Sequence, residues 1–103
     1  MTIRRGESYP IYISLKQDGV ILTPDMIAGL KVCLGDLHKT YGSGVGFDEQ
    51  TMQWWIHPTQ AETLAMQKGQ SEVCAHVKYH NGSLYIVDLG KVNVKSGCCE
   101  EVF

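Results

Sequence analysis

The sequence predicts an all-β protein, a β-sandwich of about seven short strands with one short helix between two of them. Three observations predict this fold. Several short segments alternate between apolar and polar residues, and a period of two is typical of strands. Turn residues recur at about the 8–12-residue spacing of sandwich proteins. Only one segment carries both a helix start signal and a helix stop signal.

The length and composition fit one soluble globular domain spanning residues 1–103. Apolar residues make up 44% of the chain, charged residues 19%, and the formal net charge is −2. This charge argues against non-specific nucleic-acid binding, which needs a basic stripe. No apolar run approaches the ~20 residues of a membrane helix, and none follows Arg4 and Arg5 as in a signal peptide. We therefore expect no nucleic-acid or membrane partner, and reduced thiols in the cytoplasm of the producing cell.

The first strand is expected in "YPIYISL", residues 9–15, where Ile11 and Ile13 face the core and Tyr12 faces outward. An Asp-Gly turn at residues 18–19 predicts a hairpin with "VILT". The next strand is expected to be "LKVCLGDLHKTY", residues 30–41, bent at Gly35. "GSGVGF", residues 42–47, is interpreted as a flexible hairpin, because it lacks the lysine and the following helix of a phosphate loop.

The adjacent tryptophans of "TMQWWIH", residues 51–57, must point to opposite faces of a strand. Trp54 shares its face with Met52 and Ile56 and is expected in the core. Trp55 faces the polar side and needs some other cover.

The single helix is expected within residues 59–68. Thr59 and Glu62 form the S/T-x-x-E pattern of a capping box, and Gly69 is a stop signal. The segment is too short to be helical alone in water, so it must pack on the sheet as a lid or a crossover. Its apolar stripe is predicted to comprise Ala61, Leu64, Ala65 and Lys68.

The segment at residues 71–90 is a hairpin centred on Asn81-Gly82, with "KVNVK" as a further strand. A two-residue turn there pairs Tyr79 with Leu84 and Val77 with Ile86, so all four side chains point inward. The opposite face is then too apolar for a solvated sheet face and must be covered by the helix or by another protein. The candidate interface consists of the outward residues Tyr12, Trp55, Tyr85, Val87 and Leu89.

The four cysteines, Cys33, Cys74, Cys98 and Cys99, are expected to be reduced and free of metal. Cys33 and Cys74 are the alternative candidates for an inter-sheet pair. Cys74, His76 and His80 are the alternative metal ligands, but the chain has no Cys-x-x-Cys spacing, and the His-x-x-x-His spacing of His76 and His80 falls in an expected strand rather than a helix. The two histidines would also lie about 13 Å apart along a strand. We therefore predict no metal and no cofactor.

The sequence carries no motif of a known catalytic site. Neither G-x-S-x-G nor H-E-x-x-H occurs. Asp36 and Asp48 flank the glycine-rich segment, where acids commonly cap turns. We predict that the protein is not an enzyme and has no catalytic residues.

The pattern of strands favours an immunoglobulin-like sandwich, with a small open barrel as the alternative. Residues 30–87 resemble small immunoglobulin-like domains of tailed phages and prophages of Gram-positive bacteria, including the N-terminal domain of baseplate upper proteins. The resemblance lies in the order "LGDLHKTY", a glycine-rich turn, a tryptophan strand, "TQAET", "KG" and a strand closing on "NG". The strand "EVCAHV" and the tail "GCCEE" depart from it.

The resemblance implies a non-enzymatic structural protein of a virion, in the tail, baseplate or head. Such a protein would be made in the bacterial cytoplasm and would assemble with itself or with other virion proteins. The alternative is a carbohydrate- or ligand-binding module, which would need a flat platform built from Tyr12, Trp55 and Tyr85.

Overall fold

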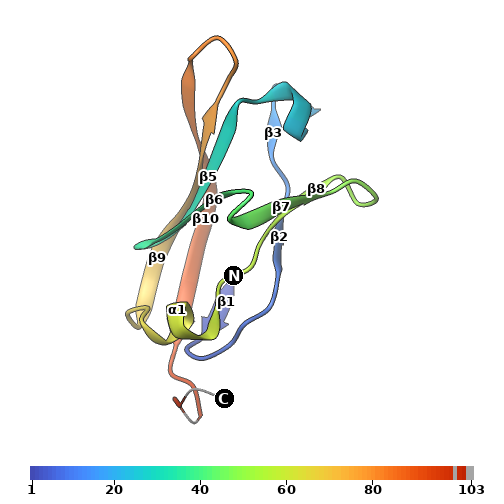
Figure 1. Ribbon diagram of the computed structural model, residues 1–103. Coiled ribbons are helices and arrows are strands. Elements are labelled where there is room, and N and C mark those ends of the chain that lie inside the picture. The colour runs from blue at the N-terminus through green and yellow to red at the C-terminus, as the bar shows by residue number, and fades with distance from the viewer. Residues whose placement is uncertain (99, 102–103) are drawn as a thin grey trace.

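The computed structural model describes residues 1–98 and 100–101, and it confirms an all-β protein with one short α-helix between strands (Figure 1). A single 3₁₀ turn (Pro24–Met26) follows the first short hairpin. The elements are β1 (Thr2–Arg4), β2 (Ile11–Ile13), β3 (Lys16–Gln17), β4 (Val20–Ile21), β5 (Gly29–Leu34), β6 (Leu37–Tyr41), β7 (Gly44–Asp48), β8 (Gln53–Ile56), α1 (Gln60–Leu64), β9 (Gly69–Lys78) and β10 (Leu84–Lys95).

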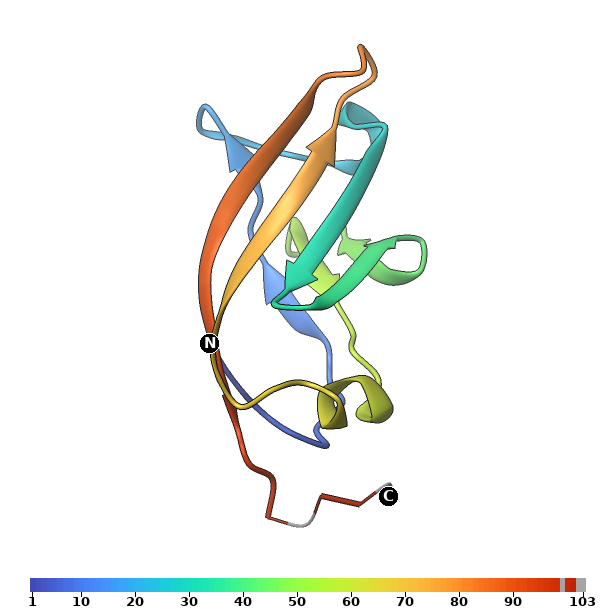
Figure 2. The same ribbon diagram turned by 90° about the vertical axis from the view of Figure 1, so that its left-hand side faces the viewer.

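Eight of the strands form one curled sheet in the order β1-β10-β9-β5-β6-β7-β8-β2, and β3 pairs only with β4. The long strands β5, β9 and β10 make one half of the sheet, and the short strands β7, β8 and β2 make the other (Figure 2). Only two residue pairs join the halves, where β6 runs parallel to β7. Buried side chains from both halves form a single core cluster, which includes Val32, Val73, Val77, Val92, Ile13, Trp54 and Ile56.

The predicted long strand at residues 30–41 is wrong, because the chain folds back on itself there. β5 and β6 form a tight hairpin in which Leu34 pairs with Leu37. Gly35 adopts a φ of +60°, a left-handed conformation that glycine tolerates at little cost. Its amide also donates to the carbonyl of Glu72 at 3.0 Å, a normal hydrogen-bond length. The glycine therefore makes a turn rather than a bend.

The predicted hairpin at residues 42–47 is also misplaced. Gly42 and Gly44 both have positive φ values, and they turn the chain so that β7 starts at Gly44 beside β6. The hairpin instead joins β7 to β8, with Asp48 paired to Gln53. Met52 lies in this turn with a φ of +55° and is 38% exposed, so it does not share the core face of Trp54.

The two tryptophans do point to opposite faces, as expected. Trp54 is fully buried, and its indole Nε1 donates to the carbonyl of Leu22 at 2.8 Å. Its ring makes edge contacts with Phe47 and Tyr41, at centroid distances of 5.0 and 5.3 Å. Trp55 is half-buried on the other face. Trp54 is therefore a central part of the core.

The capping box of α1 is confirmed, but the helix is shorter than predicted and packs differently. Thr59 Oγ1 accepts from the amide of Glu62 at 3.2 Å, and the Thr59 amide donates to Glu62 Oε1 at 2.7 Å. The predicted apolar stripe is wrong, because Ala61 and Ala65 are exposed while Thr63 is fully buried. The helix ends at Leu64 and is held by polar contacts instead.

The register of the 71–90 hairpin differs from the prediction by one residue. Leu84 pairs with Lys78 and Tyr85 pairs with Val77. The amide of Gly82 donates to the carbonyl of Tyr79 at 3.0 Å, and Gly82 has a φ of +88°. This is a three-residue loop, a turn followed by a left-handed glycine. A shift of one residue moves every side chain of a strand to the other face.

At Asp18-Gly19, unlike at Asn81-Gly82, the dipeptide forms the two-residue turn that it predicts. Asp18 and Gly19 both have positive φ values, as a two-residue hairpin turn of this kind requires, and the predicted turn is confirmed. The strand paired with β4 is β3, however, because Ile11–Ile13 in the expected strand at residues 9–15 pairs with β8 instead. The "KVNVK" segment is not a separate strand. It continues β10 beyond a bulge between Asp88 and Gly90.

Candidate assembly surface

The outer face of the long-strand half carries a mixture of apolar, cationic and thiol side chains. Strand pairing aligns Thr40, Lys31, His76 and Ile86 in one row across β6, β5, β9 and β10. The neighbouring row contains His38, Cys33, Cys74 and Asp88. A third row pairs Gly29 and Leu84 with Lys78.

Leu84 and Ile86 are the most exposed large hydrophobic side chains among the described residues, at 71% and 69%. A two-residue turn would place both side chains inside, whereas the observed register of the hairpin turns them outward. They are two residues apart on β10, so they share one face. Together they form an apolar pair at the end of the sheet opposite α1 (Figure 1).

Three of the predicted interface residues lie on the inner side of β10. Val87 and Leu89 are half-buried and pack against the core, so they do not form an outward face. Tyr85 is 47% exposed, and its ring makes an edge contact with Tyr79 at 5.3 Å between centroids. The hydroxyl of Tyr79 in turn donates to Gln17 Oε1 on β3. The physical reason for the correction is the register shift of the hairpin.

The other two predicted interface residues, Tyr12 and Trp55, are register partners on the outer face of β2 and β8. Tyr12 is 49% exposed. Trp55 is covered by its own sheet, because its ring lies over Gly46, where a Cβ atom would come within 2.2 Å of Trp55 Cζ2. This contact within the sheet accounts for the partial burial of Trp55. Tyr85 lies on the opposite side of the sheet from this pair.

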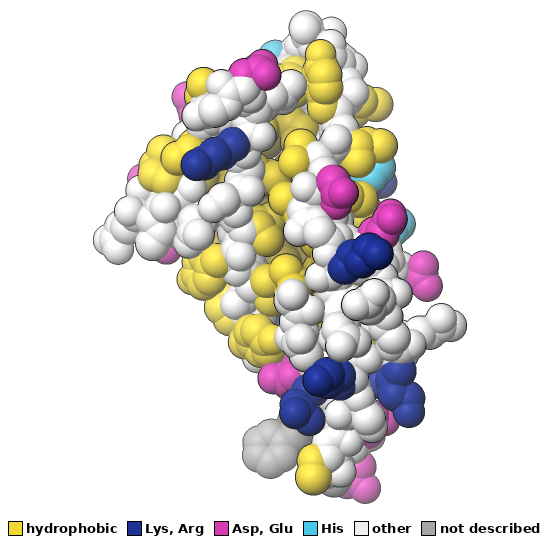
Figure 3. All heavy atoms as spheres, turned by 180° about the vertical axis from the view of Figure 1, so that it is seen from behind, with side chains coloured by type: hydrophobic (Ala, Val, Ile, Leu, Met, Phe, Trp, Pro, Cys, Tyr) yellow, Lys and Arg dark blue, Asp and Glu magenta, His cyan; other side chains and the backbone are white. Residues whose placement is uncertain are grey.

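The sheet has open edges in the described residues. β10 pairs with β9 along one edge, while β1 pairs with the other edge only from Asn93 to Lys95. β2 is the last strand on the other side. Seen from behind, hydrophobic side chains are visible along the middle of the molecule (Figure 3). Because β1 pairs with β10 only from Asn93 onward, the backbone edge of β10 beside Leu84 and Ile86 is free to pair with an added strand.

The helix lies at the other end of the molecule and does not cover this surface. Thr63 Oγ1 donates to the carbonyl of Glu7 at 2.8 Å and accepts from the amide of Gly6 at 3.0 Å. The guanidinium of Arg5 donates to the carbonyl of Leu64 at 2.6 Å. These contacts tie α1 to the segment between β1 and β2, as a lid on one end of the core.

A salt bridge of 2.8 Å joins Glu62 of α1 to Lys39 of β6. Burial alone would raise the pKa of Glu62, but hydrogen bonds from Lys39 and from the Thr59 amide bring this pKa below its usual value. The carboxylate is therefore held ionised as part of the structure.

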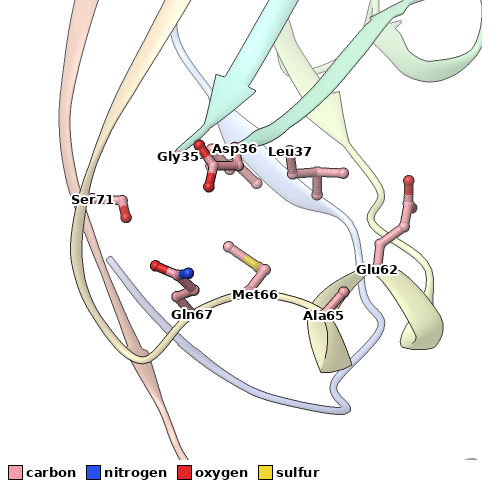
Figure 4. Close-up of a pocket in the computed structure, with 9 residues that line it drawn as sticks. Gly35, Asp36, Leu37, Glu62, Ala65, Met66, Gln67 and Ser71 are labelled. Carbon is pink, nitrogen blue, oxygen red and sulfur yellow. The ribbon is translucent and has the colours of Figure 1, made fainter.

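A small pocket of about 230 Å³ lies between the β5–β6 turn and the segment that follows α1 (Figure 4). Its lining includes two carboxylates, Asp36 and Glu62. Glu62 is already engaged by the salt bridge with Lys39.

Strand pairing brings together a different set of possible metal ligands from the one expected from the sequence. The ligand atoms of Cys33, Cys74 and His76 lie within 4.8 Å of one another. His80 is elsewhere, with Nε2 at 3.2 Å from the carbonyl oxygen of Asp25. Cys33 and Cys74 pair on adjacent strands of the same sheet rather than across two sheets, and both are free thiols. Burial raises the pKa of the Cys33 thiol, the Cys74 thiol raises it further, and Lys31 lowers it in part.

Comparison with known proteins gives no family: no family model matches the chain, and no curated protein matches it either. Among the described residues, no helix has the length and apolar character needed to cross a membrane.

Proposed function

We propose that this chain is a non-enzymatic structural protein of a tailed-phage or prophage virion, acting in the tail, baseplate or head through protein–protein assembly. Its partners are further copies of itself or other virion proteins. In this proposal the curled sheet is a variant of the immunoglobulin-like sandwich, with the long-strand half and the short-strand half as its two layers. The basis for the phage assignment is the sequence resemblance of residues 30–87.

The observation that carries the assembly proposal is the exposure of Leu84 and Ile86 beside an open strand edge. These side chains are 71% and 69% exposed, and β10 has no β1 partner before Asn93. An added strand could use the free backbone groups for affinity and the two apolar side chains for specificity. A neighbouring molecule would also remove this apolar surface from water.

The non-enzymatic part of the proposal is supported by how the polar groups are used. In the described residues, every buried side-chain nitrogen and oxygen atom has a hydrogen-bond partner. The buried hydroxyl of Thr63 and the indole of Trp54 both bond to backbone groups of the fold. An active site is expected instead to hold convergent polar groups that await a substrate.

The test is a pair of charge substitutions at the exposed apolar pair, Leu84→Lys and Ile86→Lys in one chain. The purified wild-type protein should form an oligomer in light scattering or bind a virion protein that is identified in phage particles. The double variant should lose that complex and keep the melting temperature of the wild type. Met52→Lys is the matched control, because Met52 is also partly exposed but lies in the β7–β8 turn.

Two results would contradict the proposal. One is a wild-type chain that stays monomeric and binds none of the proteins of the particle. The other is a complex that survives the double substitution unchanged, which would move the contact away from β10.

The alternative function, a carbohydrate-binding module, is supported by the exposed ring of Tyr12 next to Trp55. It loses its third aromatic residue, since Tyr85 lies on the other side of the sheet. Glycan-array binding that Tyr12→Ala abolishes would favour this alternative.

A further inference from the structure

Two thiols and an imidazole meet at the centre of the outer face of the sheet. Cys33 on β5 is the register partner of Cys74 on β9, and His76 follows two residues later on β9. Cys74 and His76 therefore share a face, and Cys33 lies beside them on the next strand. The two Sγ atoms and a ring nitrogen of His76 all lie within 4.8 Å of one another.

We propose that Cys33, Cys74 and His76 bind one thiophilic metal ion, with Zn²⁺ as the best-matched divalent cation. In a tetrahedral zinc site the Zn–S and Zn–N bonds are about 2.3 and 2.0 Å, which places neighbouring ligand atoms roughly 3.5–3.8 Å apart. The observed limit of 4.8 Å exceeds this spacing by about 1 Å. Small side-chain rotations of the three residues can close such a gap.

The donor set selects the class of metal. Two thiolates and one imidazole suit zinc and other soft or borderline ions, whereas calcium and magnesium prefer oxygen ligands. Binding requires the two thiols to lose their protons to solvent, so that two thiolate–metal bonds replace two S–H bonds. The two negative charges formed are then balanced by the divalent cation.

The three residues leave the fourth position of a tetrahedral site open to water or to a further side chain. His38 is the register partner of Cys33, and Asp88 is the register partner of Cys74. Both residues belong to the same row of the sheet, and both are exposed. A bound ion would link β5 to β9 at the middle of the long-strand half.

This proposal differs from the expectation drawn from the sequence, which was no metal. That expectation rested on spacing along the chain, and Cys33 is 41 positions before Cys74. Only the pairing of β5 with β9 brings the two thiols together. His80, which the sequence grouped with Cys74 and His76, serves instead as an internal control.

The test is a zinc titration of the full chain after reduction and removal of metal, followed by calorimetry. Binding of Co²⁺, read from the thiolate-to-cobalt absorption band, gives an independent report on sulfur ligation. We expect one ion per chain for the wild type. The Cys98→Ser/Cys99→Ser variant should bind equally well, which excludes the C-terminal cysteines as the source of the signal.

The decisive variants are Cys74→Ser and His76→Gln, with His80→Gln as the matched control on the same hairpin. We expect the first two to weaken zinc binding by at least about tenfold, since each removes one of three protein ligands, and the third to leave it unchanged. His76 is half-buried on the outer face, so His76→Gln keeps the test valid if Cys74→Ser fails to fold.

Three results would overturn the proposal. These are the absence of zinc binding by the reduced wild-type chain, binding that survives both decisive variants, and binding that is lost with the C-terminal cysteines. If the reduced chain binds no zinc, the proposal is overturned even if Cys33 and Cys74 form a disulfide on oxidation. All measurements use the isolated chain, so they are independent of the assembly proposed for β10.

Discussion

The inner and outer faces of the long-strand half are built on different principles. Val73, Ala75 and Val77 of β9 point inward and are completely buried, whereas Cys74 and His76 between them point outward and are half-buried. The inner face is uniform because its residues fill one shared core. The outer face is mixed, with a thiol–imidazole group in its middle and the apolar pair Leu84 and Ile86 at its end. This difference indicates that stability is concentrated on one face and proposed interactions on the other.

The largest expected effect is on the inner side of the short-strand half, at Trp54. Trp54→Ala should lower the free energy of unfolding by about 3–5 kcal/mol, because it leaves a large cavity among buried side chains. It also removes the indole donor from the carbonyl of Leu22, a 2.8 Å hydrogen bond. Thermal and urea denaturation would measure the loss. Trp54→Phe is the control that retains most of the ring, and a melting temperature within a degree or two of the wild type for Trp54→Ala would contradict the core position.

The second prediction compares two neighbouring residues on opposite faces of β10. Val87→Lys should destabilise the fold by about 2–3 kcal/mol, because a charge replaces a side chain packed against the core. Ile86→Lys should change stability by no more than about 0.5 kcal/mol, since Ile86 is 69% exposed.

Urea denaturation of both single variants measures this difference directly. Equal effects would show that the two faces of β10 are not distinct. A larger effect at position 86 would restore the register predicted from the sequence.

The same strand shows where prediction from sequence succeeds and where it fails. Alternation identified β9 and β10 as strands, and the capping box located the start of α1. Alternation cannot choose between two registers, because Leu84, Tyr85, Ile86 and Val87 are all apolar or aromatic. The choice depended on the geometry of the Asn81-Gly82 loop, in which only Gly82 has a positive φ.

Residues that meet only after strands pair are even harder to predict from the sequence. Gly35 could be a bulge or a turn, and in the turn its amide donates a hydrogen bond to the carbonyl of Glu72, on a strand distant in the sequence. Likewise, no local pattern links Cys33 with His76, which lie on paired strands. The register therefore places Val87 and Leu89, which were expected to face outward, on the inner side of β10.

The third prediction concerns a place where the outer face is itself packed. Gly46→Ala should destabilise the protein by about 1–3 kcal/mol, because the new Cβ would come within 2.2 Å of Trp55 Cζ2 and displace the ring. The loss should be partly restored by Trp55→Leu in the same chain, since the smaller side chain leaves room for a methyl group. A double-mutant cycle measured by urea denaturation tests this coupling. Additive effects would mean that Trp55 does not rest on Gly46.

The smallest expected effect is that of removing the hydroxyl of Thr63, at the end of the core that α1 covers. Thr40, on the outer face, is its control. Thr63 is fully buried, and its hydroxyl serves the Glu7 carbonyl and the Gly6 amide. Thr63→Val keeps the shape but leaves these backbone groups without their partner, which should cost about 1–2 kcal/mol. Thr40→Val, at an exposed position of β6, should stay within about 0.5 kcal/mol of the wild type.

Chemical denaturation of the two valine variants is the measurement, and hydrogen exchange at the Gly6 amide adds a local readout. If the hydroxyl holds α1 against the segment between β1 and β2, the Gly6 amide should exchange faster in Thr63→Val at a denaturant concentration far below the unfolding midpoint. Unchanged exchange together with unchanged stability would mean that α1 is attached mainly through Arg5 and Leu64. The attachment of α1 to this end of the core would then depend on the 2.6 Å contact of the Arg5 guanidinium with the Leu64 carbonyl rather than on the buried hydroxyl.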